Sequence, residues 1–244
     1  MNNIFIFIPV KKNSTRLKNK NLSKIYNMSL LEKKIQICKK LKSVHIIVST
    51  DSEKIKKISL KNKVNEIRIR PKKYSTSKST LISVVLDYLR YKIKKRENLA
   101  KYIAILPVTN PFLKLETIKK SIRILRNSKK INSVVSVVPS TFHPYLFVDI
   151  KKKIKFNKFK ISYQKKKFDR SQDRPKTYIL SGALRITRTN YFLKYLKNKN
   201  SKFAHPIYDK ALSLPIIINS KESHDINNSF DLKVAKILNN INSY

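Results

Sequence analysis

The chain holds very little of several residue types, and each shortage excludes something. Gly182 is the only glycine among 244 residues, whereas an average chain of this length carries about 17. Cys38 is the only cysteine, so the sequence predicts no disulfide and no cysteine-based metal site, which is typical of a reducing cytoplasm. No apolar run approaches the roughly 18 residues of a membrane span. The first residues also lack the basic start and the length of a signal peptide. We therefore expect a cytoplasmic protein with no membrane span.

The position of the single glycine is informative, because no other position in the chain has one. Glycine is needed where φ must be positive or where another group must approach the backbone closely. Gly182 is therefore expected to serve one of these needs. Two interpretations stay open: a wall of a small-molecule site, or a strained turn without a ligand.

Acidic residues are also scarce. The chain has 14 Asp and Glu against 56 Lys and Arg, a formal net charge of +42 at pH 7. Such a charge is ordinarily typical of proteins that bind nucleic acid or an anionic membrane surface. The lysines are spread along the whole chain, however, beside many Asn, Ile, Tyr and Phe, whose codons are AT-rich. We interpret the charge mainly as genome composition on solvated surfaces, with a polyanion footprint as the alternative. In either case the field favours anionic substrates such as nucleoside triphosphates.

The first 138 residues alternate short apolar runs with helical patterns, which is typical of βαβ units and a mostly parallel sheet. The expected strands are Ile4–Val10, Val44–Ser49, Glu66–Arg70, Tyr102–Leu106 and Ser133–Val138. The expected helices are Ser29–Leu41, Glu53–Leu60, Thr80–Arg96 and one through Leu115, Ile118, Ile122 and Leu125. From 141 to 167 the chain is aromatic and basic without a helical period, which predicts a β-rich insertion.

The α/β pattern returns after the insertion. It predicts a strand at Tyr178–Thr187, a short helix near Tyr191–Leu196, a strand at Leu214–Ile218 and a last helix after Asn228 and Ser229. The buried stripe of that helix is expected to consist of Phe230, Val234, Ile237, Leu238 and Ile241. We expect one α/β domain over residues 1–244, with a Rossmann-like, mostly parallel sheet flanked by helices and an insertion at about 140–175.

In open parallel sheets, ligands bind beyond the carboxyl ends of the strands. The loop after the first expected strand is polar and cationic. Lys11, Arg16 and Lys20 can neutralise a triphosphate there, while Ser14 and Asn21 can donate hydrogen bonds. The alternative is a solvated lysine-rich loop.

Later strand exits carry further polar residues. Asp51 or Ser52 is expected to cap the helix after the second strand. Arg70 follows the third strand, and a rigid loop with two prolines, 106–112, follows the fourth. Asp225 lies between the last strand and the last helix, where it suits a hard-cation ligand; helix capping is the alternative. The histidines have no metal-ligand spacing and are expected to be structural or on the surface: His45, His143, His205 and His224.

Taken in order, these segments resemble the cytidylyltransferases that activate nonulosonic acids, namely the acylneuraminate (CMP-sialic acid) synthetases and their pseudaminate and legionaminate relatives. The match covers nearly the whole chain, and its order is more specific than any one segment. The matching residues are Ile8-Pro9, Ser14, Arg16-Leu17, Lys20-Asn21, residues 49–55 (STDSEKI), Arg70-Pro71, residues 108–111 (VTNP), residues 171–175 (SQDRP), Tyr178, residues 181–186 (SGALRI) and 225–227 (DIN).

The resemblance implies transfer of CMP from CTP to the anomeric oxygen of an acidic nine-carbon sugar, with Mg²⁺ as cofactor and pyrophosphate as product. It implies a homodimer in which the insertion reaches toward the partner, and no binding of nucleic acid is expected. By the match, Lys11, Ser14, Arg16, Lys20, Asn21 and Arg70 bind the nucleotide, and Asp225 and Asn227 hold the metal. Lys11, Lys20 and Asp225 are the catalytic candidates. The sugar-binding candidates are Arg170, Gln172, Arg174, Ser181 and Gly182.

The sequence departs from the family pattern at several of these positions. Lys12 and Asn13 replace the loop glycines, and Lys11 replaces an arginine, which keeps the charge but loses the fork. Asn227 replaces the second metal aspartate. The other replacements are Ser171 for an arginine, Ser181 for an asparagine and Pro107 for a glutamine. Two alternatives therefore stay open: a KDO cytidylyltransferase, whose first loop also contains Ser-Thr-Arg, and a non-catalytic polyanion-binding protein on the same fold.

Overall fold

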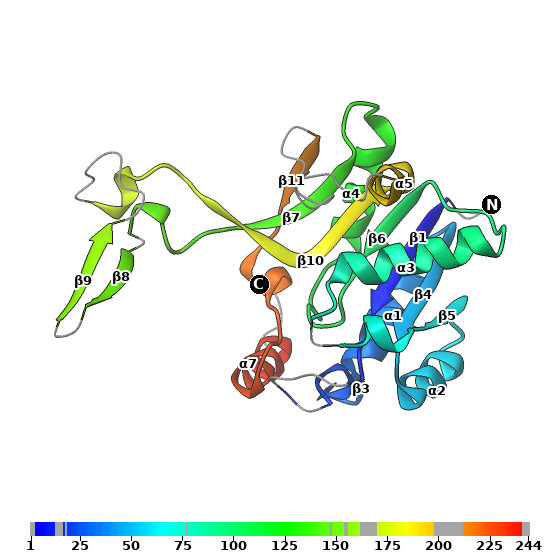
Figure 1. The fold of residues 1–244 in the computed structure, drawn as a ribbon. Coiled ribbons are helices and arrows are strands. Elements are labelled where there is room, and N and C mark those ends of the chain that lie inside the picture. The colour runs from blue at the N-terminus through cyan, green and yellow to red at the C-terminus, as the bar shows by residue number, and fades with distance from the viewer. Residues whose placement is uncertain are drawn as a thin grey trace.

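The computed structural model describes residues 3–12, 17, 19–76, 78–146, 148–153, 156–161, 170–197 and 212–240. At its centre lies a seven-stranded sheet with the order β11-β7-β10-β6-β1-β4-β5 (Figure 1). The strands are β1 (Ile4–Pro9), β4 (Val44–Thr50), β5 (Glu66–Ile69), β6 (Tyr102–Ile105), β7 (Ser133–Pro139), β10 (Tyr178–Arg188) and β11 (Ser213–Ile217). Only β10 runs against its neighbours, β6 and β7. The predicted mostly parallel sheet is confirmed.

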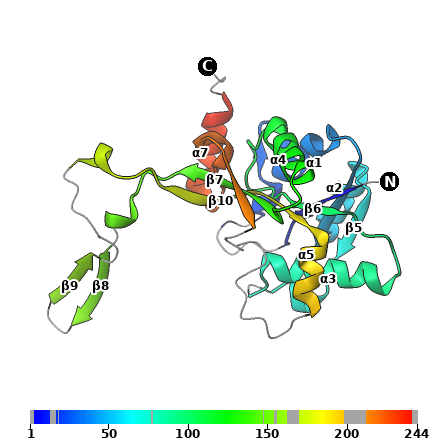
Figure 2. The same cartoon turned by 90° about the horizontal axis from the view of Figure 1, so that it is seen from above.

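Helices cover both faces of the sheet (Figure 2). One face carries α1 (Leu30–Lys39), α2 (Glu53–Lys61) and α4 (Leu115–Asn127), and the other carries α3 (Leu81–Lys94) and α5 (Thr189–Lys197). The side chains of β1 alternate between the two layers, as those of any strand do. Ile4, Ile6 and Ile8 pack in the cluster that contains α1 and α4. Phe5 and Phe7 pack with α3 and α5 on the opposite face. Burial on both faces explains why this strand reads as a continuous apolar run.

Side-chain caps fix where the helices begin. Ser29 and Glu32 form a reciprocal capping box at the start of α1. Ser52 caps α2, which settles the choice between Asp51 and Ser52, and Thr80 caps α3. These helices therefore begin where the sequence predicts.

The last helix, α7 (Ser229–Asn240), follows the short α6 (Ser220–Ser223), and its expected stripe is partly wrong. Phe230 and Ile237 are exposed, and Ile241 lies outside the described residues. The core contacts come from Leu232 and Ala235 instead. The helix starts at a second reciprocal cap, in which Asn228 and Asp231 each accept a hydrogen bond from the other's backbone amide. The cap fixes where the helix begins, and the apolar spacing alone does not show which of its residues face the core.

The predicted insertion forms an arm that projects from the sheet (Figures 1 and 2). Its described parts include a hairpin of β8 (Val148–Lys153) and β9 (Phe156–Ile161), and the 3₁₀ turns η3 (Pro144–Leu146) and η4 (Ser171–Asp173). At its base, Ser140 donates its amide to the Thr177 carbonyl at 2.9 Å. His143 Nε2 donates to the Pro175 carbonyl at 3.0 Å. A small hairpin of β2 (Lys24–Ile25) and β3 (Met28–Ser29), which the sequence did not predict, precedes α1. Within the described residues, no helix has the length and apolarity needed to cross a membrane.

Candidate functional site

The exits of β1, β4 and β5 are tied together at the carboxyl edge of the sheet. The Val10 amide donates to the Ser49 carbonyl at 2.8 Å, and the Arg70 amide donates to the Thr50 carbonyl at 2.8 Å. Asp51 extends this connection, because its Oδ1 accepts a hydrogen bond from the Lys12 amide at 2.6 Å. Three loops that are far apart in sequence therefore form one surface, as expected for an open parallel sheet.

Arg70 holds two of these loops together from inside the protein. Its side chain is buried, with Nε donating to the Ser49 hydroxyl at 2.9 Å and Nη2 to the Ser49 carbonyl at 2.8 Å. Burial lowers the pKa of Arg70 to about 10, although the negative charges of Asp51 and Asp87 oppose that shift. The guanidinium therefore keeps its charge at neutral pH while it links the exits of β4 and β5.

The first loop places its cations on the same surface. Lys11 and Lys20 are half-buried, and Asn21 joins the two ends of the loop by donating its Nδ2 to the Lys11 carbonyl at 2.8 Å. The family match implied contact of Asn21 with nucleotide; here its side-chain amide also closes the loop. Ser14 and Arg16 lie outside the described residues.

Asp225 is brought to this edge by the loop that follows β6. The Ile226 amide donates to the Thr109 carbonyl at 2.9 Å. Asn110 Nδ2 donates to the carbonyls of Ser223 and His224 at 3.1 and 3.2 Å. Because β6 is hydrogen-bonded to β1, the Asp225 loop sits at the exit next to the cationic loop. The exits of β1, β5 and β6 thus carry Lys11 and Lys20, Arg70, and Asp225 respectively, and the exit of β4 lies among them.

The two metal candidates contact each other. Asp225 is exposed, and its Oδ2 accepts a hydrogen bond from Asn227 Nδ2 at 2.8 Å. Asp231 holds the same loop, because its Oδ2 accepts the Asn227 amide at 2.8 Å. No group of three or more His, Cys, Asp or Glu side chains suited to a metal occurs in the described part of the chain. A cation here would therefore have one carboxylate and one amide oxygen from the protein.

The sugar-binding candidates divide into two groups. Arg170, Gln172 and Arg174 belong to the arm, on and beside η4, where Arg170 and Gln172 are exposed. The arm projects from the sheet, so these residues do not join the cluster at the strand exits (Figure 1). Ser181 and Gly182 lie in β10, which passes beside the exit of β6.

Gly182 lies in a bulge of β10 and not in a strained turn. Leu180 pairs with Val137 and Arg185 with Val135, so the four residues between them face only Ser136. The Ser136 hydroxyl donates to the carbonyls of Ser181 and Leu184 at 3.1 and 3.2 Å, and it accepts the Leu184 amide at 3.1 Å. Gly182 does not have a positive φ, and a Cβ there would meet no atom within 4 Å. The strained-turn interpretation is therefore wrong, and open space is left beside the Gly182 backbone.

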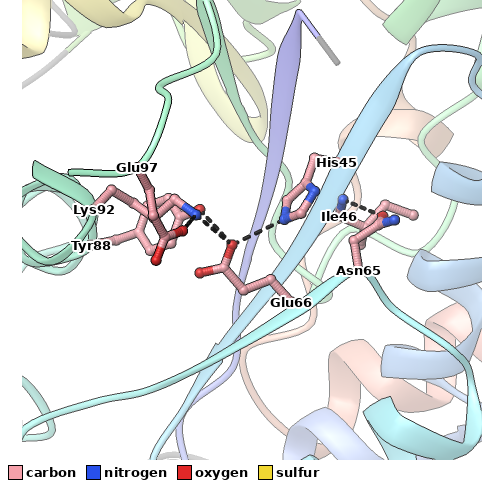
Figure 3. Close-up of polar contacts among 7 residues, drawn as sticks. All are labelled: His45, Ile46, Asn65, Glu66, Tyr88, Lys92 and Glu97. Atoms are coloured by element: carbon pink, nitrogen blue, oxygen red, sulfur yellow. Dashed lines mark hydrogen bonds and ion pairs between the residues drawn. The ribbon is translucent and has the colours of Figure 1, made fainter. Parts of the chain in front are cut away.

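A second polar group lies at the opposite, amino edge of the sheet (Figure 3). Glu66 Oε2 accepts hydrogen bonds from His45 and Tyr88, each at 3.0 Å, and from Lys92 at 3.2 Å. Lys92 also pairs with Glu97. These residues link β4, β5 and α3 far from the strand exits. The prediction that His45 is structural fits this arrangement.

A cavity of about 460 Å³ also opens at the amino edge, between the C-terminal parts of α1 and α4. It is lined by Ile4, Leu41, Ile122, Asn127 and the cations Lys40, Lys42, Lys119, Arg123 and Arg126. Because Ile4 begins β1, this cavity lies at the end of the sheet away from the strand exits and forms no part of the candidate site.

A family model described as cytidylyltransferase matches residues 5–211. The chain belongs to the cytidylyltransferase family. The matched range includes all four strand exits up to β6, the bulge of β10 and the arm, and it stops before Asp225.

The chain is also similar to two curated proteins and to solved structures. It is 30% identical over 142 residues to a CMP-N,N'-diacetyllegionaminic acid synthase of Legionella pneumophila subsp. pneumophila, across 58% of this chain and 60% of that protein. It is 32% identical over 127 residues to a 3-deoxy-manno-octulosonate cytidylyltransferase of Rickettsia typhi, across 52% of this chain and 50% of that protein. The matches thus span about half to three-fifths of the length of these relatives.

One of these solved structures is that of CMP:2-keto-3-deoxy-manno-octonic acid synthetase complexed with CTP. Its TM-score is 0.69 with 11% identity, over 96% of this chain and 97% of that chain. At this identity the likeness establishes the fold, which is the mostly parallel α/β fold that the sequence predicted.

Proposed function

We propose that this protein transfers CMP from CTP to a nonulosonic acid and releases pyrophosphate. The observation that carries the proposal is the convergence of Lys11, Lys20, Arg70 and Asp225 on the exits of adjacent strands. Family membership and the two curated relatives, both named for acidic sugars, support it. The cytoplasm is the proposed compartment, supported by a lone cysteine that is buried and unpaired.

The reaction needs positioning and charge neutralisation more than it needs a protein nucleophile. The anomeric hydroxyl oxygen of the sugar attacks the α-phosphorus of CTP and loses its proton. The bond from the α-phosphorus to the bridging oxygen breaks, and pyrophosphate leaves. Lys11 and Lys20 would hold the triphosphate and stabilise the charge that grows on its oxygens. Arg70 would keep the β4 and β5 exits, and hence the nucleotide pocket, in place.

The residues at the metal candidate position fit Mg²⁺. This ion prefers oxygen ligands and is commonly bound by one or two carboxylates together with substrate phosphates. Asp225 supplies an exposed carboxylate, and Asn227 supplies an amide beside it. When bound, the ion would neutralise phosphate charge and orient the leaving group. The protein's part is to hold Asp225 against the β6 exit through the Thr109 and Asn110 contacts.

The sugar-binding part of the site is proposed to involve a second copy of the chain. Arg170, Gln172 and Arg174 lie on the arm, away from their own strand exits. Large apolar side chains are exposed on the arm and on the neighbouring ends of β10 and β11. They are Phe142, Leu146, Tyr178, Ile179, Leu180 and Ile217. Large apolar side chains that stay exposed in one region are typical of a protein interface, and a homodimer would cover them.

The test is pyrophosphate release from CTP with a panel of sialic, pseudaminic and legionaminic acids and KDO. We expect turnover with a nine-carbon acid and about a hundredfold loss of kcat/KM in Asp225→Ala without unfolding. A matched control is Asp173→Ala on the arm, which should leave the metal requirement unchanged. Turnover with KDO alone would favour the KDO cytidylyltransferase alternative. Tight RNA binding with a steep salt dependence and no turnover would overturn the enzyme assignment in favour of a polyanion binder.

A further inference from the structure

Lys34 of α1 is a buried cation beneath the exit of β6. Its side chain is 2% exposed, among the apolar residues with which α1 covers the sheet. Its Nζ donates to the Asn110 carbonyl at 2.8 Å. Burial lowers the pKa of Lys34 to about 8, so most of the molecules carry the ammonium at pH 7. Cys38, one turn further along α1, has its pKa raised to about 12 by burial and stays a neutral thiol.

Asn110 connects Lys34 to the loop that carries Asp225. Its carbonyl is held by Lys34, while its side-chain amide donates to the carbonyls of Ser223 and His224. The residue itself is 1% exposed, so these bonds are shielded from water. The adjoining Thr109 carbonyl accepts the Ile226 amide at 2.9 Å. Residues on both sides of Asp225 are therefore fixed to a two-residue stretch whose position Lys34 sets.

A buried ammonium in this place is costly. Removing a charge from water is unfavourable, and even buried ion pairs can often be replaced by apolar side chains without loss of stability. A buried charge among apolar core residues is expected at functional positions. Lys34 contacts Asn110, which in turn holds the loop that carries the proposed metal ligand, so a functional role explains why the charge is kept here.

We propose that Lys34 is a positioning residue for the reaction: through the carbonyl of Asn110 it sets the position of the Asp225 loop. The proposal rests on the proposed function for its catalytic meaning, but its structural part can be measured separately. The bond of Lys34 to Asn110 connects it to the Asp225 loop through the 109–110 stretch.

The structural part is tested by amide hydrogen exchange of Lys34→Met in the full chain without ligands. Methionine keeps the length of the side chain and removes the donor. We expect the Ile226 amide to exchange about tenfold faster while core amides of β1 and β6 keep their protection. Lys39→Met, on the exposed face of the same helix, is the matched control and should change nothing. Unchanged exchange at Ile226 in Lys34→Met would overturn the proposal.

The catalytic part is tested by the dependence of pyrophosphate release on Mg²⁺. We expect the half-saturating Mg²⁺ concentration of Lys34→Met to rise about tenfold, with the KM for the sugar unchanged. Asn110→Ala removes the next link and should give the same increase, and the double variant should be no worse than either single one. Additive effects, or an equal rise in the KM of both substrates, would reveal general destabilisation instead.

The two readouts separate the possible failures. If the wild-type chain releases no pyrophosphate, the proposed function fails, and the exchange experiment still decides whether Lys34 positions the loop. If Lys34→Met does not fold, Lys34→Leu carries the exchange test, because it also removes the donor to the Asn110 carbonyl. Ile226 exchange as slow in a folded Lys34→Leu as in the wild type would then overturn the proposal.

Discussion

The carboxylate of Asp51 holds the backbone of Lys12, with 2.6 Å between Oδ1 and the amide nitrogen. The contact joins two residues that are 39 positions apart and fixes the start of the cationic loop against the exit of β4. Asp51 is one of only 14 acids in a chain with 56 Lys and Arg. Its position explains how the start of this loop, at Lys12, is held to the exit of β4.

Replacing Asp51 is expected to weaken nucleotide binding more than it weakens the fold. In Asp51→Ala the loop with Lys11 and Lys20 loses its anchor, so the KM for CTP should rise about tenfold, the equivalent of one charge-assisted hydrogen bond. Asp51→Asn keeps an oxygen acceptor, so its KM for CTP should lie between those of the wild type and Asp51→Ala. Steady-state kinetics measure the effect, with the exposed Glu53→Ala as the control. An unchanged KM for CTP in Asp51→Ala would show that the loop needs no such anchor.

Gly182→Ala is expected to leave the fold intact. The Gly182 backbone has no positive φ, and a methyl group would enter open space. Alanine at a compatible position stabilises by about 0.5 kcal/mol through the unfolded chain. Any loss of activity in Gly182→Ala must then come from a ligand that approaches the bulge, and it should appear in the KM for the acidic sugar. Thermal unfolding without ligand, combined with kinetics, separates the two; a large fall in unfolding temperature would contradict the open space seen here.

The sheet and the first helices could be predicted because their signals are local. The apolar run of β1 and the caps at Ser29, Ser52 and Thr80 lie within a few residues of the elements they define. The bulge at Gly182 could not be predicted, because it depends on how many residues of β10 face Ser136 on another strand. The buried face of α7 could not be predicted for a similar reason, because it depends on how Leu232 and Ala235 pack against other elements.

The candidate site divides in the same way. The cations at the strand exits follow from the order of strands and loops, so Lys11, Lys20 and Arg70 could be named in advance. Lys34 and Asn110 could not, because a lysine bonded to a distant backbone carbonyl leaves no pattern in the sequence. Only its place among apolar residues on α1 hinted at burial, and in a chain this rich in lysine the hint is weak.

Ser136→Ala is expected to destabilise the fold by about 1–3 kcal/mol, because it leaves one amide and two carbonyls of the bulge without their partner in a buried place. Ser133→Ala is the matched control in the same strand. Ser133 is equally buried but shares a single hydroxyl contact with Ser213, so the loss there should be smaller. Urea unfolding measures both variants, and an equal loss in the two would contradict the special role of Ser136 in the bulge.

The surroundings of Glu66 indicate how the stability of the fold depends on pH. Burial alone would raise the pKa of Glu66, but the hydrogen bonds from His45 and Tyr88 and the charge of Lys92 outweigh it and hold that pKa below its ordinary value (Figure 3). A carboxylate of this kind contributes stability above its unfolded pKa, about 4.3, and loses that contribution as the pH falls through the lower folded value. Lys92 is also buried, yet Glu97 and Glu66 raise its pKa. The stability that the charge of Lys92 contributes is therefore lost only at alkaline pH.

Glu66→Gln should therefore cost about 2 kcal/mol of unfolding free energy at pH 7, since hydrogen bonds to a charged group are removed. The difference between wild type and variant should stay constant down to about pH 5 and shrink toward pH 3 as Glu66 becomes protonated in the wild type. Urea unfolding at several pH values gives the measurement. High salt is needed throughout, because it screens the self-repulsion of a chain with net charge +42. Glu53→Gln, whose partner Lys56 is on the surface, should change little at any pH. If the gap between wild type and Glu66→Gln did not narrow in acid, Glu66 would not be ionised within this cluster.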